Sequence, residues 1–470
     1  MQSHTYSAPA SYVSSPSGDP YKYQVGFGNR FASEAIPGTL PQGQNHPQKN
    51  KYGLYMEGMT GSPFIAPRHQ NLHAFMYRIR PSLDHKKFVR LPDNPDMESN
   101  FLPINPKVRI SPTQLNWAPP VLPSSSDEVD FIAGLKTIGG NGEPTSREGL
   151  ALHFYSANAD MKNKAFCNSD GDMLVVPQQG RLDVQTEFGR MMVRPGELMV
   201  IQKGMKFKVS LPDGPSRGYV QEIFGSHFEL PDLGPIGGHG MANPRDFEVP
   251  LASFEVDETS WEIVYKIGGQ LFSAAQDHTP FDVVAWQGNY VPYKYPLEKF
   301  IFVGSLFKDH MDPSVFTVLT SKSKAAGIPL VEVLVVSERW DVATDSFRPP
   351  YYHRNNATEI LAPVFGKPGD RFVPGGITLQ TVFCPHGPPP DVHKAASIAE
   401  LKPERISKDR MAIAFETPMV LSMTDYAMNR AGTVTESEPL SFPPDFIAHL
   451  DEINADLKAA GYDELKKKSG

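Results

Sequence analysis

The chain has 470 residues, of which 40% are hydrophobic and 21% are charged, and its formal net charge is -8. These values are typical of a globular protein that is long enough for two or three domains. A negative charge without long runs of Lys or Arg excludes a broad electropositive surface for nucleic acid or anionic lipid. The triplet Lys466, Lys467 and Lys468 is interpreted as a solvated end.

The cysteine content and the N-terminal residues indicate a cytoplasmic protein. Cys167 and Cys384 are too few and too far apart for a disulfide framework or a Cys-rich zinc site, which favours a reducing compartment. Residues 1–20 are rich in Ser, Pro, Ala and Tyr and lack an apolar core, so they are interpreted as a disordered arm and not as a signal peptide. No uncharged apolar run reaches the length of a membrane span. We therefore expect no membrane partner.

Short strands joined by turns dominate the predicted structure. The 45 prolines and 38 glycines are spread along the chain, and they interrupt long helices. Residues 171–209 show short apolar runs separated by Gly-containing turns, which fits four strands. This part of the chain has the layout of a cupin barrel, a small double-sheet jelly roll. A turn at Pro195 and Gly196 is followed by a strand and by a second turn at Lys203 and Gly204.

A second, looser copy of this pattern runs from about 281 to 388, with residues 372–376 at the position of the first copy's turn. The predicted fold class is therefore all-β dominated, a bicupin with two jelly-roll barrels. Residues 443–467 carry apolar side chains at helical spacing and predict a short C-terminal helix. The expected divisions are a disordered arm at 1–20, an N-terminal domain with a metal-free cupin barrel at 21–280, a C-terminal metal-binding cupin domain at 281–440 and a helical tail at 441–470.

Three residues of the second copy are candidate metal ligands: His353, Glu359 and His386. Two imidazoles and one carboxylate leave coordination positions open for substrate and O2, which is the pattern of non-haem Fe(II) oxygenases, whereas a structural zinc site uses four protein ligands. The alternative is that these are ordinary hydrogen-bonded residues, since most histidines bind no metal. Residues 165–209 of the first copy contain no histidine. The isolated histidines are interpreted as structural: His153, His227, His239, His278 and His310.

Several long stretches carry a resemblance to a known family, among them YQVGFGNRFASEA, YGLYMEGMTGSPFIAPR, VVAWQGNYVPYKY and FRPPYYHRN. Over nearly its whole length the chain resembles the homogentisate 1,2-dioxygenase family. The resemblance implies a bicupin-like fold, a homo-oligomer of three or six chains, and Fe(II) bound by His353, Glu359 and His386. It also implies a small phenolic substrate and O2 as partners, with opening of a hydroquinone ring.

The chain departs from the family at pocket positions. Gln287 stands where the family has its catalytic base, the histidine of AWHGNY, and Gln380 replaces another pocket histidine. Phe365 and Pro368 stand at the positions of a family arginine and a substrate-binding tyrosine. Glutamine forms hydrogen bonds but does not titrate near neutral pH, so a base is missing. Tyr352 and His386 are further expected substrate contacts.

These departures predict a pocket with fewer charged and titratable groups, suited to a less acidic or bulkier phenol than homogentisate. One alternative is a catalytically silent cupin that binds a metal but has lost its reaction. Another is a bicupin storage protein, although the sequence lacks the Gln/Arg/Glu-rich tracts and the secretion signal typical of that class. The sequence leaves the phenolic substrate and the pathway open.

Overall fold

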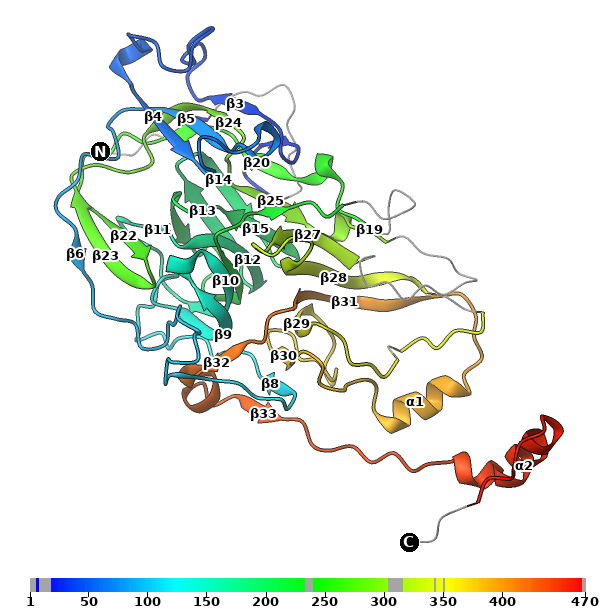
Figure 1. Cartoon of the computed structure of the whole chain (residues 1–470). Helices are drawn as coiled ribbons and strands as arrows, with labels where there is room; N and C mark the ends of the chain where they lie inside the picture. Colours follow the sequence, from blue (N-terminus) through cyan, green and yellow to red (C-terminus); the bar gives the residue numbers. More distant parts are fainter. Residues whose placement is uncertain are drawn as a thin grey trace.

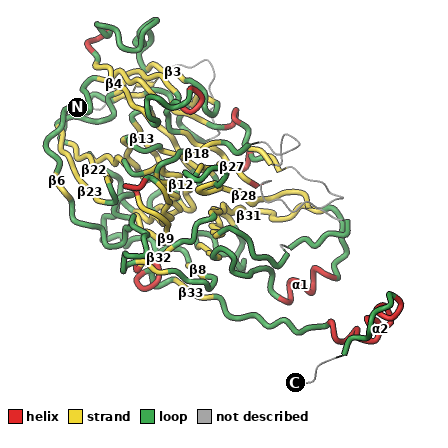
Figure 2. The backbone as a smooth tube through the Cα atoms, viewed as in Figure 1, coloured by secondary structure: helices red, strands yellow, loops and turns green. Residues whose placement is uncertain are grey.

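A computed structural model describes residues 6–7, 18–232, 240–302, 316–341, 344–349 and 351–466. Strands fill the centre of the molecule and the helices lie at its margin (Figure 1, Figure 2). The two α-helices are α1 (Pro390–Ser397) and α2 (Leu450–Ala459). No described helix is long and apolar enough to cross a bilayer. The prediction of a β-dominated fold is confirmed.

Two large sheets build the first barrel. Sheet I has ten strands, in the spatial order β2 (Tyr23–Val25), β20 (Glu248–Pro250), β25 (Tyr293–Pro296), β15 (Glu197–Ile201), β12 (Gly171–Gln179), β17 (Ser216–Phe224), β10 (Glu148–Ala157), β9 (Leu135–Glu143), β32 (Ser422–Thr424) and β7 (Val108–Arg109). Sheet II has seven, in the order β14 (Gly189–Val193), β13 (Leu182–Thr186), β16 (Lys206–Ser210), β11 (Lys164–Asn168), β22 (Trp261–Ile267), β23 (Gln270–Gln276) and β6 (Val89–Arg90). The sheets face each other, because Lys266 of β22 forms a buried ion pair with Glu222 of β17 at 2.7 Å.

Residues 171–209 form five strands, β12 to β16, and not the four that the sequence suggested. The extra strand arises because only Glu187 and Phe188 separate β13 from β14, and both side chains are buried. The turn before β15 has the expected counterpart in the second copy. Gly196 precedes β15, Gly375 lies just before β30 (Ile377–Gln380), and both glycines have φ +90°, a left-handed conformation that favours glycine.

Sheet III carries the second copy of the pattern. Its eight strands are, in spatial order, β18 (Phe228–Glu229), β27 (Thr317–Lys322), β28 (Pro329–Asp341), β31 (Glu404–Thr417), β29 (Thr358–Phe365), β30, β8 (Leu115–Trp117) and β33 (Val434–Glu436). Along β29, Thr358, Ile360 and Ala362 are buried while Glu359 and Leu361 are half-buried. This period of two gives the sheet one face towards the core and one partly open face.

The strands that follow residue 280 belong to the N-terminal part of the molecule. β24 (Val283–Gly288) lies in the four-stranded sheet IV, between β3 (Phe31–Glu34) and β5 (His73–Arg78), with β4 (Tyr55–Thr60) at the edge. β25 pairs with β15 in sheet I. We therefore propose a division after β25 in place of the boundary expected near residue 280.

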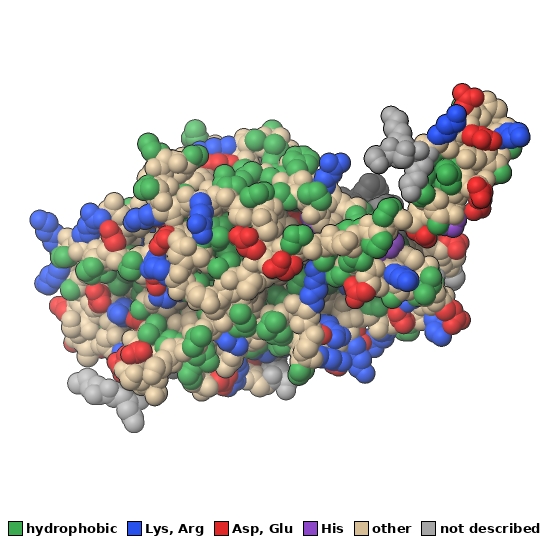
Figure 3. Space-filling model, turned by 90° about the horizontal axis from the view of Figure 1, so that it is seen from below, with side chains coloured by type: hydrophobic (Ala, Val, Ile, Leu, Met, Phe, Trp, Pro, Cys, Tyr) green, Lys and Arg blue, Asp and Glu red, His purple; other side chains and the backbone are tan. Residues whose placement is uncertain are grey.

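Two short ribbons and the C-terminal tail complete the chain. β1 (Tyr6–Ser7) pairs with β21 (Ser253–Phe254), and β19 (Gly240–Met241) pairs with β26 (Ile301–Phe302). Apart from β1, the arm expected at residues 1–20 lies outside the described residues up to residue 17. The expected C-terminal helix is present as α2, preceded by a 3-10 turn at Phe446–His449, and it projects from the body (Figure 1, Figure 3). Phe446, in the 3-10 turn, and Leu465, after the helix, are exposed.

Candidate metal centre

His353 and His386 lie side by side because their backbones form an isolated antiparallel bridge. The His353 amide donates to the His386 carbonyl at 3.0 Å, and the His386 amide donates to the His353 carbonyl at 3.1 Å. Phe383 has φ +58°, which is unusual for a bulky residue, and its amide donates to the carbonyl of Asn355. These contacts tie the loop before β29 to the loop after β30. The two imidazole rings are thereby held with centroids 4.1 Å apart.

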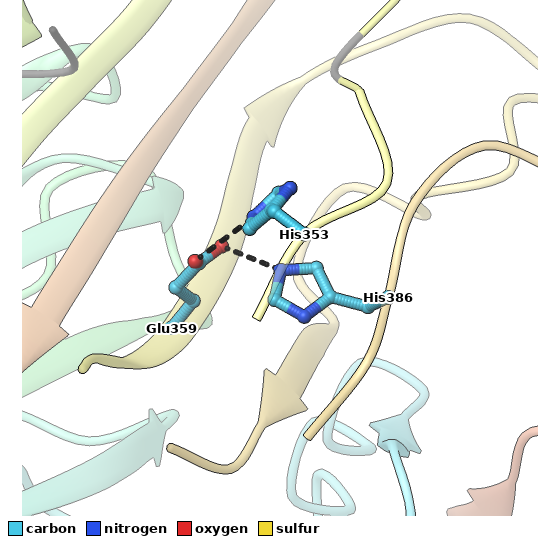
Figure 4. Close-up of side chains that lie close together, drawn as sticks. All are labelled: His353, Glu359 and His386. Atoms are coloured by element: carbon cyan, nitrogen blue, oxygen red, sulfur yellow. Dashed lines mark hydrogen bonds and ion pairs between the residues drawn. The ribbon is translucent and has the colours of Figure 1, made fainter. Parts of the chain in front are cut away.

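Glu359 is the second residue of β29 and its side chain lies on the partly open face of sheet III. Both imidazoles point at its carboxylate (Figure 4). The Nε2 atom of His353 lies 3.4 Å from Oε1, and the Nε2 atom of His386 lies 3.2 Å from Oε2. One ligand atom of each residue lies within 4.8 Å of the others, which makes this the potential metal cluster among the described residues. The three candidate ligands therefore converge as predicted.

The hydrogen bonds of the imidazoles fix which nitrogen faces the centre. The Nδ1 atom of His353 donates to the Tyr351 carbonyl at 2.8 Å, and that of His386 donates to the Cys384 carbonyl at 3.0 Å. With Nδ1 donating to a carbonyl, the two Nε2 atoms and the Glu359 carboxylate all face one point, where a proton on Nε2 or a bound cation offsets the negative charge. Imidazoles held in this way by backbone carbonyls are typical of metal sites. The donor set and its orientation fit a divalent cation.

Asn355 is a residue of the site that the sequence did not single out. Its side-chain nitrogen donates to Oε1 of Glu359 and so fixes the carboxylate between the imidazoles. Burial raises the pKa of Glu359, but hydrogen bonds from His386 and Asn355 outweigh it and hold that pKa below its usual value. Burial lowers the pKa of His386, but the hydrogen bond to Glu359 prevails and the pKa is raised. The metal-free cluster therefore favours an ionised carboxylate beside a protonated imidazole.

A row of polar side chains crosses sheet III through Glu359, and we call it the carboxylate row. Strand register places Glu416 of β31 opposite Glu359 on one side and opposite Glu332 of β28 on the other. On the other side of Glu359 stands Gln380 of β30, whose amide donates to Gln114 at 3.3 Å. Residues in register on antiparallel strands share a face. Burial, followed by the charges of Glu359 and Glu332, raises the pKa of Glu416 to about 7.

The other predicted pocket residues of this region are placed differently. Phe365 ends β29, is 40% exposed, and lines a groove of about 700 Å³ to which none of the three candidate ligands contributes. Pro368 lies in an exposed turn. Tyr352 packs on His393 and Phe442, with ring centroids 5.4 Å apart in both pairs. Gln380 is thus the substituted position that lies directly beside a ligand.

Gln287 lies in β24 of sheet IV, and its amide donates to the side chain of Asn45 at 2.8 Å. Sheet IV and the strands β29 and β30 are well separated in the molecule (Figure 1). Within one chain, the position at which the family resemblance implies a base is therefore not beside the candidate ligands.

The isolated histidines that the structure describes have hydrogen-bond partners, as expected. His153 contacts Thr137 and Glu222, His227 contacts Asp172 and the carbonyl of Gly61, and His278 contacts Asp277. His239 and His310 lie outside the described residues.

Comparison with known proteins gives the family. The homogentisate 1,2-dioxygenase N-terminal family matches residues 22–297 and the C-terminal family of that enzyme matches residues 298–438. Their junction falls directly after β25, where strand pairing also changes.

Curated relatives named homogentisate 1,2-dioxygenase match most of the chain. The Dictyostelium discoideum protein is 48% identical, with 87% of this chain and 93% of that protein covered. The human protein is 45% identical, with 88% and 94% covered. Among solved structures, Lactobacillus farciminis oxalate decarboxylase covers 67% of this chain and 89% of its own, at 9% identity and a TM-score of 0.26, which is too remote to carry an argument. The chain belongs to the homogentisate 1,2-dioxygenase family.

Proposed function

We propose that this protein is an Fe(II)-dependent dioxygenase that opens the ring of a hydroquinone-type phenol, and that its substrate differs from homogentisate. The observation that carries the proposal is the convergence of two Nε2 atoms and one carboxylate on the open face of sheet III. Relatives that are 45–48% identical bear the name of a ring-cleaving dioxygenase. Bound Fe(II) would supply a Lewis acid and a redox partner for O2 while keeping coordination positions free.

The side chains have separate roles in this proposal. His353, Glu359 and His386 hold the ion, and Asn355 fixes the Glu359 carboxylate. Gln380, opposite Glu359 in register, can orient a phenolic hydroxyl by hydrogen bonding but cannot accept its proton. The strand β29 and the two loops joined by the His353–His386 bridge can hold the ring beside the ion.

Of four substitutions relative to the family pattern, Gln380 is the one that stands beside a candidate ligand, and it supports a substrate other than homogentisate. Relative to the family pattern, Gln287, Phe365, Pro368 and Gln380 replace two imidazoles, a guanidinium and a phenol. A substrate binds much more weakly when the pocket lacks the hydrogen-bond partner of one of its polar groups, because that group is left unpaired. The metal ligands are retained, so we infer a changed pocket around an unchanged ion site.

The test uses full-length protein loaded with Fe(II) under anaerobic conditions. Iron content is measured first, and O2 uptake and product absorbance are then recorded with homogentisate and with a panel of substituted hydroquinones. We expect about one iron per chain and faster O2 uptake with at least one hydroquinone than with homogentisate. His386→Ala should lose both iron and O2 uptake, while His278→Ala, a histidine outside the site, should keep both.

The outcomes separate the competing functions. Iron binding without O2 uptake for any phenol would identify a catalytically silent metal-binding cupin. Rapid opening of homogentisate, at about 10 per second, would confirm the dioxygenase and contradict the changed substrate. Retention of iron by His386→Ala would place the metal elsewhere.

A further inference from the structure

The C-terminal tail, residues 437–466, combines an apolar stripe with acidic side chains. Its 3-10 turn and α2 together, residues 446–459, are called the tail helix. Apolar residues at intervals of four, three and four place a stripe on one side of it: Phe446, Leu450, Ile453 and Leu457. None of the residues of α2 is buried, and Phe446 is 59% exposed. The carboxylates at the start of the turn and along the helix are exposed: Asp445, Asp451, Glu452 and Asp456. The tail helix is therefore amphipathic and acidic.

A surface of opposite charge lies along β4, the edge strand of sheet IV. Large apolar side chains of this strand and its flanking segments are exposed: Tyr52 at 61%, Tyr55 at 54%, Phe64 at 88% and Ile65 at 95%. The exposed basic side chains of the same segments are Lys49, Lys51 and Arg68, which have no recorded ion pair within the described part of the chain. We call these side chains the β4 patch. Glu57, the carboxylate of residues 45–73, pairs with the buried Arg78 at 3.1 Å and leaves the patch basic.

The tail helix and the β4 patch match in length and in character. β4 has six residues, which at about 3.3 Å each extend over about 20 Å. The turn of four residues and the helix of ten extend over about 23 Å. An amphipathic helix that lies along β4 can therefore reach the apolar side chains at both ends of the strand. Exposed apolar side chains that gather in this way are typical of interaction sites.

The tail helix and the β4 patch of one chain lie at opposite ends of the molecule (Figure 1). Residues 437–445 join β33 to the tail helix, and fully extended they span about 30 Å. A chain of 470 residues folds to a body about 60 Å across. Because β33 lies on the side of the molecule away from sheet IV (Figure 1), the tail helix does not reach the patch of its own chain.

We infer that the tail helix of one copy docks on the β4 patch of a second copy of this chain. The apolar stripe then covers Phe64 and Ile65, and the carboxylates of the helix lie beside Lys51 and Arg68. Tail and patch are different surfaces and every copy has both, so the contact is head-to-tail and can close into a ring. Most of the tail follows residue 438, the last residue that the family matches, so this contact is separate from any assembly of the matched regions.

The test is cross-linking of full-length protein with cysteines in both surfaces. Ala455→Cys lies on the exposed side of α2, and Gln70→Cys lies beside Arg68. The double variant is treated with a short bifunctional maleimide, and covalent multimers are measured on denaturing gels. The control double variant combines Ala455→Cys with Ser125→Cys, an exposed residue outside sheet IV. We expect at least about tenfold more multimer from the first pair, since docked surfaces have a much higher effective concentration than colliding ones.

Further substitutions in the first double-cysteine protein test the contact itself. Ile65→Ser should lower the amount of multimer several-fold. Ile398→Ser is its matched control, because Ile398 is 81% exposed and lies outside tail and patch, and it should change nothing. Lys51→Glu with Arg68→Glu should also lower the amount of multimer several-fold, because these changes place like charges opposite the tail helix. Adding Asp451→Lys and Asp456→Lys to that variant should restore it.

The outcomes either support or overturn the inference. Linkage of positions 455 and 70 within one chain would place the tail helix on its own body and overturn it. Absence of that linkage would mean that another partner or solvent covers the patch, which also overturns it. Equal amounts of multimer from the control pair, or no response to the charge reversals, would show random collision in place of docking. Mass spectrometry of the linked peptides identifies which positions are joined.

Discussion

Charge removal along the carboxylate row should weaken metal binding in a graded way. Glu359→Gln removes the carboxylate that lies between the imidazoles, and a unit charge pair at 4 Å is worth about 4 kcal/mol at an effective dielectric constant of about 20. That energy corresponds to about three powers of ten in Kd. Glu332 stands two strands from Glu359, at roughly 10 Å for a strand spacing of about 4.8 Å. At that distance, and at the same effective dielectric constant of about 20, a unit pair is worth about 1.7 kcal/mol, which is about one power of ten in Kd.

The assay is anaerobic titration of metal-free protein with Fe(II), in competition with a chelator of known affinity. Expected Kd values rise most for Glu359→Gln, less for Glu416→Gln and least for Glu332→Gln. Far-ultraviolet circular dichroism of each variant checks that the sheet is intact. Similar losses in all three variants would mean that the effect is general electrostatics and not ligation. An unchanged Kd for Glu359→Gln would refute the assignment of Glu359 as a ligand.

Lys266→Met removes the cation that pairs with two buried carboxylates in the first barrel and should lower the free energy of unfolding by about 3–5 kcal/mol in urea denaturation. Lys322→Met, at an exposed ion pair, should lower it by about 1 kcal/mol or less. Burial lowers the pKa of His227, but the charge of Asp172 outweighs burial and the pKa is raised. The stability that protonated His227 adds to the fold is therefore complete below about pH 6.5 and is lost as pH rises through the folded-state pKa. The loss of unfolding free energy caused by His227→Gln should therefore become smaller as pH rises through that pKa. Sedimentation at micromolar concentration should show a trimer or hexamer, and monomer alone would contradict the assembly implied by the family.

The metal cluster could be predicted from sequence because its chemistry lies in three residues, two histidines and one glutamate. His353 and His386 are brought together by a backbone bridge between two loops, and Glu359 lies near the start of a strand whose alternating pattern places it on the open face. The turn at Gly375 was also predictable, because Pro and Gly before an apolar run have few structural interpretations. Local signals sufficed for these features.

Features that depend on strand register were not predictable. Glu416 is 57 positions after Glu359 in the chain, and only the pairing of β29 with β31 places the two side by side. A single carboxylate in the run MAIAFET has no local signature. Similarly, β24 and β25 follow residue 280 in sequence but join sheets of the N-terminal part, because strand partners are chosen by the packing of the whole core. A division at residue 280 would have cut through two of these sheets.

The placement of Gln287 limits the role that a side chain at that position can have in the reaction. A catalytic base must come within hydrogen-bond distance of the proton that it removes, directly or through one water. Gln287 instead donates to Asn45 in sheet IV, away from β29 and β30 (Figure 1). Within one chain it cannot serve as an acceptor for a phenol bound at His353, Glu359 and His386. Gln380 stands opposite Glu359 in register, so Gln380→His places an imidazole next to a candidate ligand within the same chain, and its effect on homogentisate turnover reports on a missing base.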